Sequence, residues 1–134
     1  MAKALAVRFR VDFGRHCSVG VGKIELLEGI ARTGSISQAA RDMHMSYRRA
    51  WLLLEDMKLG FDQPVAMSSV GGPGGGGVVI TEFGGRLITR YRELESELKL
   101  LAITLLDDFG NHVKGVRSKR VVQPPSIGRK PSAK

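Results

Sequence analysis

The sequence predicts a mainly α-helical domain that also contains a small antiparallel sheet. Three consecutive segments between Lys23 and Met57 carry apolar residues at helical spacing. Two short apolar runs then flank a glycine-rich loop, which is typical of a β-hairpin. A last long segment has leucines at heptad spacing, which indicates a single long helix. With 134 residues, of which 43% are hydrophobic, the chain is large enough for one domain with a modest core.

The first element is predicted to be a strand with one buried face, because apolar and polar residues alternate from Leu5 to Phe13. A turn that contains several glycines, Gly14 to Gly22, separates it from the next element. The segment KIELLEGIARTG then has the spacing of an amphipathic helix, with Ile24 and Leu27 on its apolar stripe. Gly34 follows in the position usual at a helix C-terminus.

Two short amphipathic helices follow one another in GSISQAARDMHMSYRRAW. Ser35 caps the first, and Gln38 three residues later makes a capping box. Ser46 caps the second, and His44 occupies the turn position that often holds glycine, where a positive φ is possible for histidine. Both apolar stripes have the spacing of a helix-turn-helix; they consist of Ile36, Ala39, Ala40 and Met43, then Ala50, Leu53, Leu54 and Met57.

The second of these helices has the surface of a DNA-reading helix. In a helix-turn-helix, the N-terminal residues of the second helix face the bases of the major groove. Arg48 and Arg49 project from its first exposed turn, and arginine pairs bidentately with guanine or clamps a phosphate. Ser46, at the helix N-terminus, is a candidate phosphate contact. A plain helical hairpin is the alternative, and Tyr47 and Trp51 fit the edge of a core as well as a DNA contact.

A glycine-rich hairpin comes next. Val65 to Val70 and Val78 to Ile80 are predicted as short strands, with Gly71 to Gly77 (GGPGGGG) as the loop between them. No Gly-Lys-Ser/Thr follows the glycines, which argues against a nucleotide-binding P-loop. Beside a helix-turn-helix, such a hairpin is a wing whose glycines let the backbone approach DNA. A flexible hairpin without a contact role is the alternative.

The last predicted helix, about residues 81–109, carries a candidate dimer seam. Thr81 caps it, and Glu82 lies in its first turn. Steps of four and three residues generate a heptad pattern, which consists of Leu87, Tyr91, Leu94, Leu98, Leu101 and Leu105. A homodimer is the favoured interpretation, and packing of these side chains inside one chain is the alternative.

The positive charge is concentrated at the C-terminal end. The net charge is +8, but seven of the 21 Lys and Arg residues fall in Val113–Lys134, which holds no acidic residue. Residues 113–134 are predicted to be a disordered basic tail that suits a polyanion such as DNA, and a purely solubilising end is the alternative. Residues 1–112 then form the folded domain.

Other classes of function find little support in the sequence. No apolar run approaches the roughly eighteen residues of a membrane span, and no secretory signal is recognisable. Cys17 is the only cysteine, which fits a cytoplasmic location. The three histidines lie far apart, so we expect no metal site, and no nucleophile–base or carboxylate pair suggests an enzyme. We expect no cofactor and no small-molecule effector site in this chain.

Taken together, these motifs resemble the N-terminal DNA-binding domain of the ModE-type molybdate-responsive regulators, which is related to the winged helix of LysR-type regulators. The resemblance covers about Val7 to Leu98 and rests on GSISQAA, SYRRAW and the four glycines before VVITEFGG. It implies a winged helix-turn-helix dimer on a palindromic operator. The DNA contacts that it implies are Ser35, Ser37, Gln38, Ser46, Tyr47, Arg48, Arg49, Gly74, Gly75 and Gly76. It also implies a dimer contact between the first helix, with Ile24 and Leu27, and the long helix.

The sequence departs from the family pattern in two respects. Full-length members carry C-terminal molybdate-binding domains of the Mop/TOBE kind, and 134 residues hold no such domain here, so we expect no direct molybdate sensing by this chain. Pro73 stands where family wings often have a basic residue, so we expect a weaker wing contact to phosphate. Our hypothesis is that the basic tail compensates for this loss.

We therefore predict a bacterial, homodimeric and sequence-specific transcriptional regulator that binds double-stranded DNA through the helix starting at Ser46. The resemblance links it to molybdate or molybdoenzyme genes. One alternative is a protein-interaction module that binds another regulator through the heptad helix. Another is a sequence-indifferent DNA-binding protein, whose binding would ignore sequence and collapse with salt.

Overall fold

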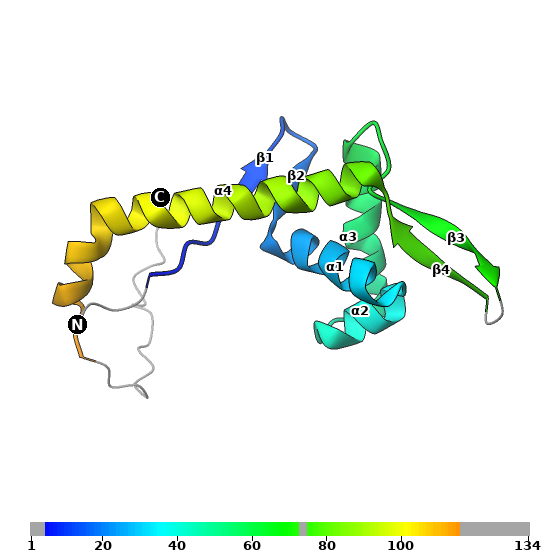
Figure 1. Ribbon diagram of the computed structural model, residues 1–134, viewed down its shortest axis with the longest axis horizontal. Coiled ribbons are helices and arrows are strands. Elements are labelled where there is room, and N and C mark those ends of the chain that lie inside the picture. Colours follow the sequence, from blue (N-terminus) through cyan, green and yellow to red (C-terminus); the bar gives the residue numbers. More distant parts are fainter. Residues whose placement is uncertain (1–4, 73–74, 116–134) are drawn as a thin grey trace, which may run out of the picture.

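The computed structural model describes residues 5–72 and 75–115 (Figure 1). Helices α1, α2 and α3 form one body, the β3–β4 hairpin projects from it, and α4 crosses the body and extends past it. In chain order the elements are β1 (Arg10–Asp12), β2 (Ser18–Gly20), α1 (Val21–Thr33), α2 (Ile36–Asp42), α3 (Tyr47–Gly60), β3 (Ala66–Gly72), β4 (Gly75–Ile80), α4 (Glu82–Leu106) and the 3-10 helix η1 (Asp107–His112). The predicted fold class, mainly α with a small antiparallel sheet, is confirmed. The predicted tail lies outside the described residues from position 116 onward.

Local sequence signals set the end of α1 and the starts of α2, α3 and α4 as predicted. Two boundaries differ, since α1 begins at Val21 within the predicted turn and α4 ends at Leu106, before the predicted end near residue 109. Gly34 ends α1 with a left-handed φ of 73°, and its N–H donates to the carbonyl of Ile30 at 2.7 Å. The hydroxyl oxygens of Ser35, Ser46 and Thr81 each accept the backbone N–H three residues later at 3.0 Å. The starts of α2, α3 and α4 therefore follow from three side-chain caps.

The capping box at the start of α2 is only half formed, so this expectation was wrong in part. Ser35 accepts the Gln38 N–H, but the Gln38 side chain does not reach back to Ser35. Its amide nitrogen donates to Asp42 at 2.9 Å, and its amide oxygen accepts from Arg41 at 2.7 Å. The Ser35 N–H donates instead to the Thr33 hydroxyl at 3.2 Å. Partners on its own helix hold the Gln38 amide.

Small residues let the helices of the helix-turn-helix approach one another. The central cluster, in which every member is at most 2% exposed, consists of Leu26, Ile30, Ala39, Ala40 and Ala50. A Cβ at Gly29 of α1 would lie 3.0 Å from the Cβ of Ala39, so α1 and α2 have no room for a larger residue there. His44 has a φ of 59° in the turn between α2 and α3, the positive φ that its place in the turn made possible.

The N-terminal segment pairs over fewer residues than the sequence predicted. Side chains alternate between half-buried and exposed from Leu5 to Val11, but only Arg10–Asp12 forms a strand. Its antiparallel partner is β2, Ser18–Gly20, which lies where a turn was expected. Tertiary contacts hold the preceding residues: the Tyr91 hydroxyl donates to the Phe9 carbonyl at 2.9 Å, and the two rings stack with centroids 4.6 Å apart.

The predicted dimer residues fall into two groups in the structure. Ile24 and Leu27 of α1 are fully buried, and Tyr91 of α4 is 5% exposed. They pack with Leu87 into the core of this one chain. The prediction that Ile24, Leu27 and Tyr91 form a dimer contact is therefore corrected, because their own fold already buries these side chains. Leu87, also predicted as a dimer contact, is partly buried and packs against this same core. The exposed part of the heptad seam begins at Leu94.

An ion pair fixes α4 to α1 next to this core. The guanidinium of Arg92 donates to both carboxylate oxygens of Glu28, at 2.8 and 2.9 Å. Arg92 also donates to Glu95 at 2.8 Å. The hydrogen-bonded guanidinium lowers the pKa of Glu28, and the carboxylates raise the pKa of Arg92.

We expect Glu28→Gln to remove stability in a pH-dependent way. A lowered pKa in the folded state adds stability above the ordinary pKa of glutamate, about 4.3, and this stability is lost as the pH falls through the lowered pKa. Since both side chains are one-third exposed, the difference at pH 7 should be about 1 kcal/mol. Urea unfolding of the wild type and the variant at pH 7 and pH 3 measures it. A difference that is equally large at both pH values would contradict the prediction.

A second stability prediction concerns the start of α4. A Cβ at Gly84 would lie 2.2 Å from the carbonyl oxygen of Val65, which also accepts the Thr81 N–H at 3.0 Å. We expect Gly84→Ala to destabilise the fold by about 1–3 kcal/mol through overpacking. Gly85→Ala is the matched control, because a Cβ there meets nothing within 4 Å. It should stabilise the helix by about 0.4–1 kcal/mol. Equal effects of the two substitutions in urea unfolding would contradict the prediction that the Val65 carbonyl leaves no room for a side chain at Gly84.

Candidate nucleic-acid interface

The first turn of α3 presents an uncompensated positive charge. Tyr47 is 53% exposed, and Arg48 and Arg49 are exposed beside it. Among the described residues neither guanidinium makes an ion pair, and the first turn contains no acidic residue. Cations near a helix N-terminus oppose the helix dipole, so this placement weakens the free helix. An anion bound at this turn would relieve that cost.

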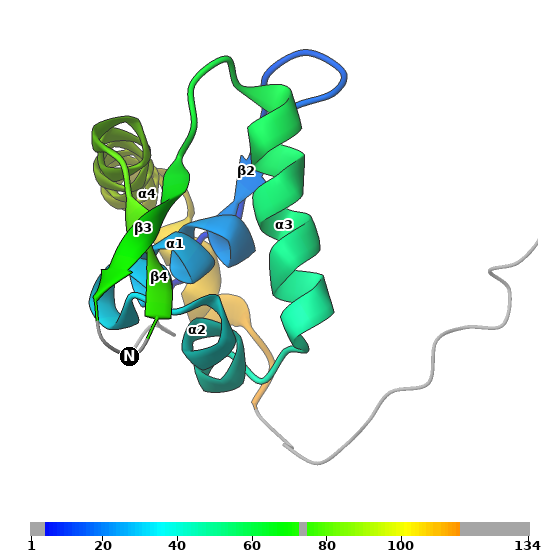
Figure 2. The ribbon, with the colours of Figure 1, turned by 90° about the vertical axis from the view of Figure 1, so that its right-hand side faces the viewer.

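The start of α2, the start of α3 and the hairpin meet at one hollow. Figure 2 shows α3 and the β3–β4 hairpin on the two sides of α2. The hollow has a volume of about 230 Å³, and its lining includes Ser35, Ser37, Tyr47 and Gly77. The structure thus brings together three predicted DNA contacts, Ser35, Ser37 and Tyr47, from the starts of two helices. Gly77, which was predicted only as part of the loop, completes this lining from the hairpin.

The hairpin is anchored to the helix-turn-helix by its glycines. The Val78 N–H donates to the carbonyl of Gly34 at 3.0 Å. A Cβ at Gly77 would lie 2.7 Å from that same carbonyl oxygen, so only glycine fits the close approach. The end of α1 therefore holds β4 directly beside α2.

The strands of the hairpin extend further into the glycine run than predicted. β3 and β4 pair from Ala66 opposite Ile80 to Gly72 opposite Gly75, with an irregularity between Ser69 and Gly72. Gly75 and Gly76, predicted as loop contacts, lie in β4. Gly74 and Pro73 lie outside the described residues. Backbone pairing, which the glycines do not prevent, overrides their loop preference.

The remaining predicted contact residues differ in how free their polar groups are. Ser37 is exposed. The hydroxyls of Ser35 and Ser46 accept backbone N–H groups but keep their own hydrogen to donate. Both ends of the Gln38 amide already have partners on α2.

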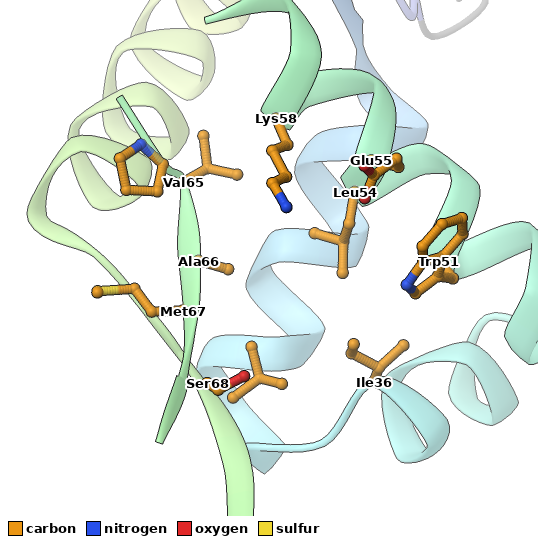
Figure 3. Close-up of a pocket in the computed structure, with 11 residues that line it drawn as sticks. Ile36, Trp51, Leu54, Glu55, Lys58, Val65, Ala66, Met67 and Ser68 are labelled. Carbon is orange, nitrogen blue, oxygen red and sulfur yellow. The ribbon is translucent and has the colours of Figure 1, made fainter. Parts of the chain in front are cut away.

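A second hollow continues along α3 on the side of the hairpin (Figure 3). Its volume is about 280 Å³, and it lies between α3 and β3. It shares Ile36 and Val78 with the first hollow, so the two form one groove between α3 and the hairpin. Lys58 also lines this hollow, although none of the sequence motifs pointed to this residue. Helical spacing could have indicated Lys58, because it follows Trp51 by seven residues and so lies on the same face of the helix.

The part of the chain that the structure describes offers little support for a metal site, a reactive thiol or a membrane-spanning helix. There, no cluster of three or more His, Cys, Asp or Glu side chains could hold a metal ion. Burial raises the pKa of the Cys17 thiol, which disfavours its nucleophilic thiolate form. Among the helices of residues 5–72 and 75–115, none is both long and apolar enough to cross a membrane.

Comparison with known proteins finds several that are similar in sequence to this chain. No protein-family model matches the chain. The chain is 35% identical over 114 residues to the molybdenum transport protein ModE of Azotobacter vinelandii, which covers 82% of the chain and 42% of that protein. It is 40% identical over 86 residues to the DNA-binding transcriptional dual regulator ModE of Escherichia coli K12, which covers 64% of the chain and 32% of that regulator.

The chain is a relative of the ModE-type regulators. A third similar protein, the molybdenum-pterin-binding protein MopB of Rhodobacter capsulatus, is 41% identical over 85 residues, or 63% of the chain and 32% of that protein. The resemblance predicted from the motifs is therefore confirmed. The chain spans less than half the length of these ModE-type relatives. Their names describe transport, regulation and ligand binding rather than enzymes, in agreement with the prediction of a non-enzymatic protein.

Proposed function

We propose that this chain is a sequence-specific transcriptional regulator that reads double-stranded DNA with α3. The observation that carries the proposal is the exposed first turn of α3, where Arg48 and Arg49 make no ion pair with any residue that the structure describes. Arginine in this position reaches guanine O6 and N7 in the major groove. The start of α2 and the hairpin flank this turn, so Ser37 and Tyr47 contact the adjacent phosphates.

The proposal includes a homodimer formed through the second half of α4. Leu94, Leu101 and Leu105 are 38%, 54% and 64% exposed, although they continue a heptad pattern. Leucines at this spacing pack against a second helix of the same kind. A second copy of the chain covers them and places two reading helices on the two halves of a palindrome.

The names of the relatives suggest which genes are regulated. They refer to molybdenum transport, molybdenum-pterin binding and transcriptional regulation. By analogy, this chain regulates genes for molybdate uptake or molybdoenzymes. The absence of an effector site in this chain and the DNA-binding role of the basic tail stay predictions. The proposal also divides the chain into a folded domain of residues 1–112 and a basic tail of residues 113–134.

A genome-fragment binding selection tests the proposed function. The purified chain is incubated with sheared genomic DNA at near-physiological salt, and the retained fragments are sequenced. We expect enrichment of a palindrome whose half-sites lie about one helical turn, or a multiple of it, apart. Uniform recovery would favour the sequence-indifferent DNA-binding protein. No recovery would favour the protein-interaction module.

A further inference from the structure

Three polar groups converge on the groove between α3 and β3. The ammonium group of Lys58 and the ring nitrogen of Trp51 point from α3 into the groove, and the oxygen of Ser68 faces them from β3 (Figure 3). All three groups donate hydrogen bonds. Within the described residues Lys58 makes no ion pair. The groove therefore offers a free positive charge and two further donors to a ligand.

The floor beneath these donors is apolar. Ile36, Leu54, Ala66 and Val78 line it, and a hollow of about 280 Å³ remains open above them. A ligand that fits both parts has an anionic group for the donors and an apolar body for the floor. A phosphodiester with its attached deoxyribose has this combination.

The groove also lies where a DNA strand would pass. Tyr47, Trp51, Leu54 and Lys58 follow one another at helical spacing, so one stripe of α3 runs from the DNA-reading turn along the groove. A helix that lies in the major groove has a sugar–phosphate strand on each side of it, and the groove between α3 and the hairpin lies on one of these sides.

We propose that Lys58, Trp51 and Ser68 form a seat for one phosphate of the DNA backbone. This inference rests on the proposed function, because it assigns a further contact to the same DNA-binding surface. The seat positions the duplex and carries no sequence information. It supplies a backbone contact between the reading turn and the wing.

The carboxylate of Glu55 also lines the groove, one turn before Lys58, and it opposes an anion. It makes no ion pair with Lys58 in the described structure, so its charge acts on whatever enters the groove. The seat therefore predicts opposite effects of neutralising two neighbouring residues. Lys58→Gln weakens DNA binding, and Glu55→Gln strengthens it.

The test measures the affinity of the full chain for its selected operator and for an unrelated duplex over a range of salt concentrations. We expect Lys58→Gln to weaken binding to both duplexes by the same factor and to make the plot of log Kd against log salt shallower by about one unit. Lys58→Arg should keep the wild-type slope. Trp51→Phe, which keeps a ring but loses the N–H donor, should weaken both duplexes by a smaller equal factor. Lys99→Gln, on the exposed surface of α4, is the control for a charge lost elsewhere.

To locate the seat, each phosphate of one operator half-site is replaced in turn by a neutral methylphosphonate, and the affinity of the wild type and of Lys58→Gln is measured for each duplex. We expect one position where the neutral group weakens the wild type but not Lys58→Gln. If the wild type binds the operator and Lys58→Gln has an unchanged salt slope, or if no such position exists, the phosphate seat is overturned while the proposed function stands. If Lys58→Gln weakened binding to the operator but not to the unrelated duplex, the phosphate seat would also be overturned, because such a loss would indicate that Lys58 contacts a base. A wild type that binds no DNA overturns both proposals.

Discussion

Replacing both Arg48 and Arg49 by glutamate is expected to abolish operator binding while it stabilises the free protein. Each arginine that contacts a base contributes about 1–3 kcal/mol to binding, and glutamate adds repulsion from the phosphates. In the free protein the same exchange puts negative charge at the N-terminus of α3, where the helix dipole favours it by about 0.3–1 kcal/mol per residue. Fluorescence anisotropy with the operator and urea unfolding measure the two effects on the same sample.

The control for this prediction changes the same amount of charge on another surface. Arg86 and Arg90 are exposed on α4, and their replacement by glutamate changes the net charge equally. We expect this variant to keep most of the operator affinity, with only a long-range electrostatic loss that salt screens. Unchanged operator affinity in the Arg48 and Arg49 variant would refute their role. Lower stability of that variant would show that the arginines have native partners.

Leu101→Glu is expected to turn the dimer into a monomer and to remove high-affinity operator binding. In a symmetric interface the substitution acts twice, and the loss of two buried leucines costs about 3–6 kcal/mol. The monomer should fold normally, since Leu101 is 54% exposed in the single chain. Sedimentation velocity gives the oligomeric state. A comparison of full-operator and half-site duplexes gives the affinity that dimerisation adds.

Leu100→Glu is the matched control for the dimer prediction. Leu100 is 65% exposed, but it lies off the heptad stripe that contains Leu94, Leu101 and Leu105. We expect this variant to stay dimeric and to bind the operator. If Leu100→Glu dissociates the protein and Leu101→Glu does not, the second copy binds another face of α4. If wild type and both variants are monomers that bind a full operator equally well, the homodimer is refuted.

Much of the candidate DNA-binding site could be predicted from the sequence because its signals are local. The caps Ser35 and Ser46 and the left-handed turn at His44 each act over a few residues. They set where α2 and α3 begin, and hence which side chains occupy the exposed first turn of α3. Arg48 and Arg49 could be assigned to that turn without any tertiary contact.

The groove could not be predicted in the same way. Helical spacing puts Trp51 and Lys58 on one face of α3, but it does not say what lies opposite them. The hydrogen bond from Val78 to Gly34 brings the hairpin against the helix-turn-helix and so places Ser68 across from Lys58. That contact joins residues far apart in the chain, which no local pattern encodes.

The long helix shows the same division between local pattern and tertiary contact. By itself the sequence determined that Tyr91 and Leu101 share one face of α4, because both follow the heptad spacing. Only the tertiary structure decided that Tyr91 is buried against α1 and β2 of its own chain, whereas Leu101 stays exposed. The C-terminal half of α4, on which Leu101 lies, extends beyond the body of the protein (Figure 1). The physical reason is that the heptad spacing shows only which side chains form the apolar face of the helix. Packing against the same chain and packing against a second copy both remove these side chains from water, so the spacing does not distinguish them.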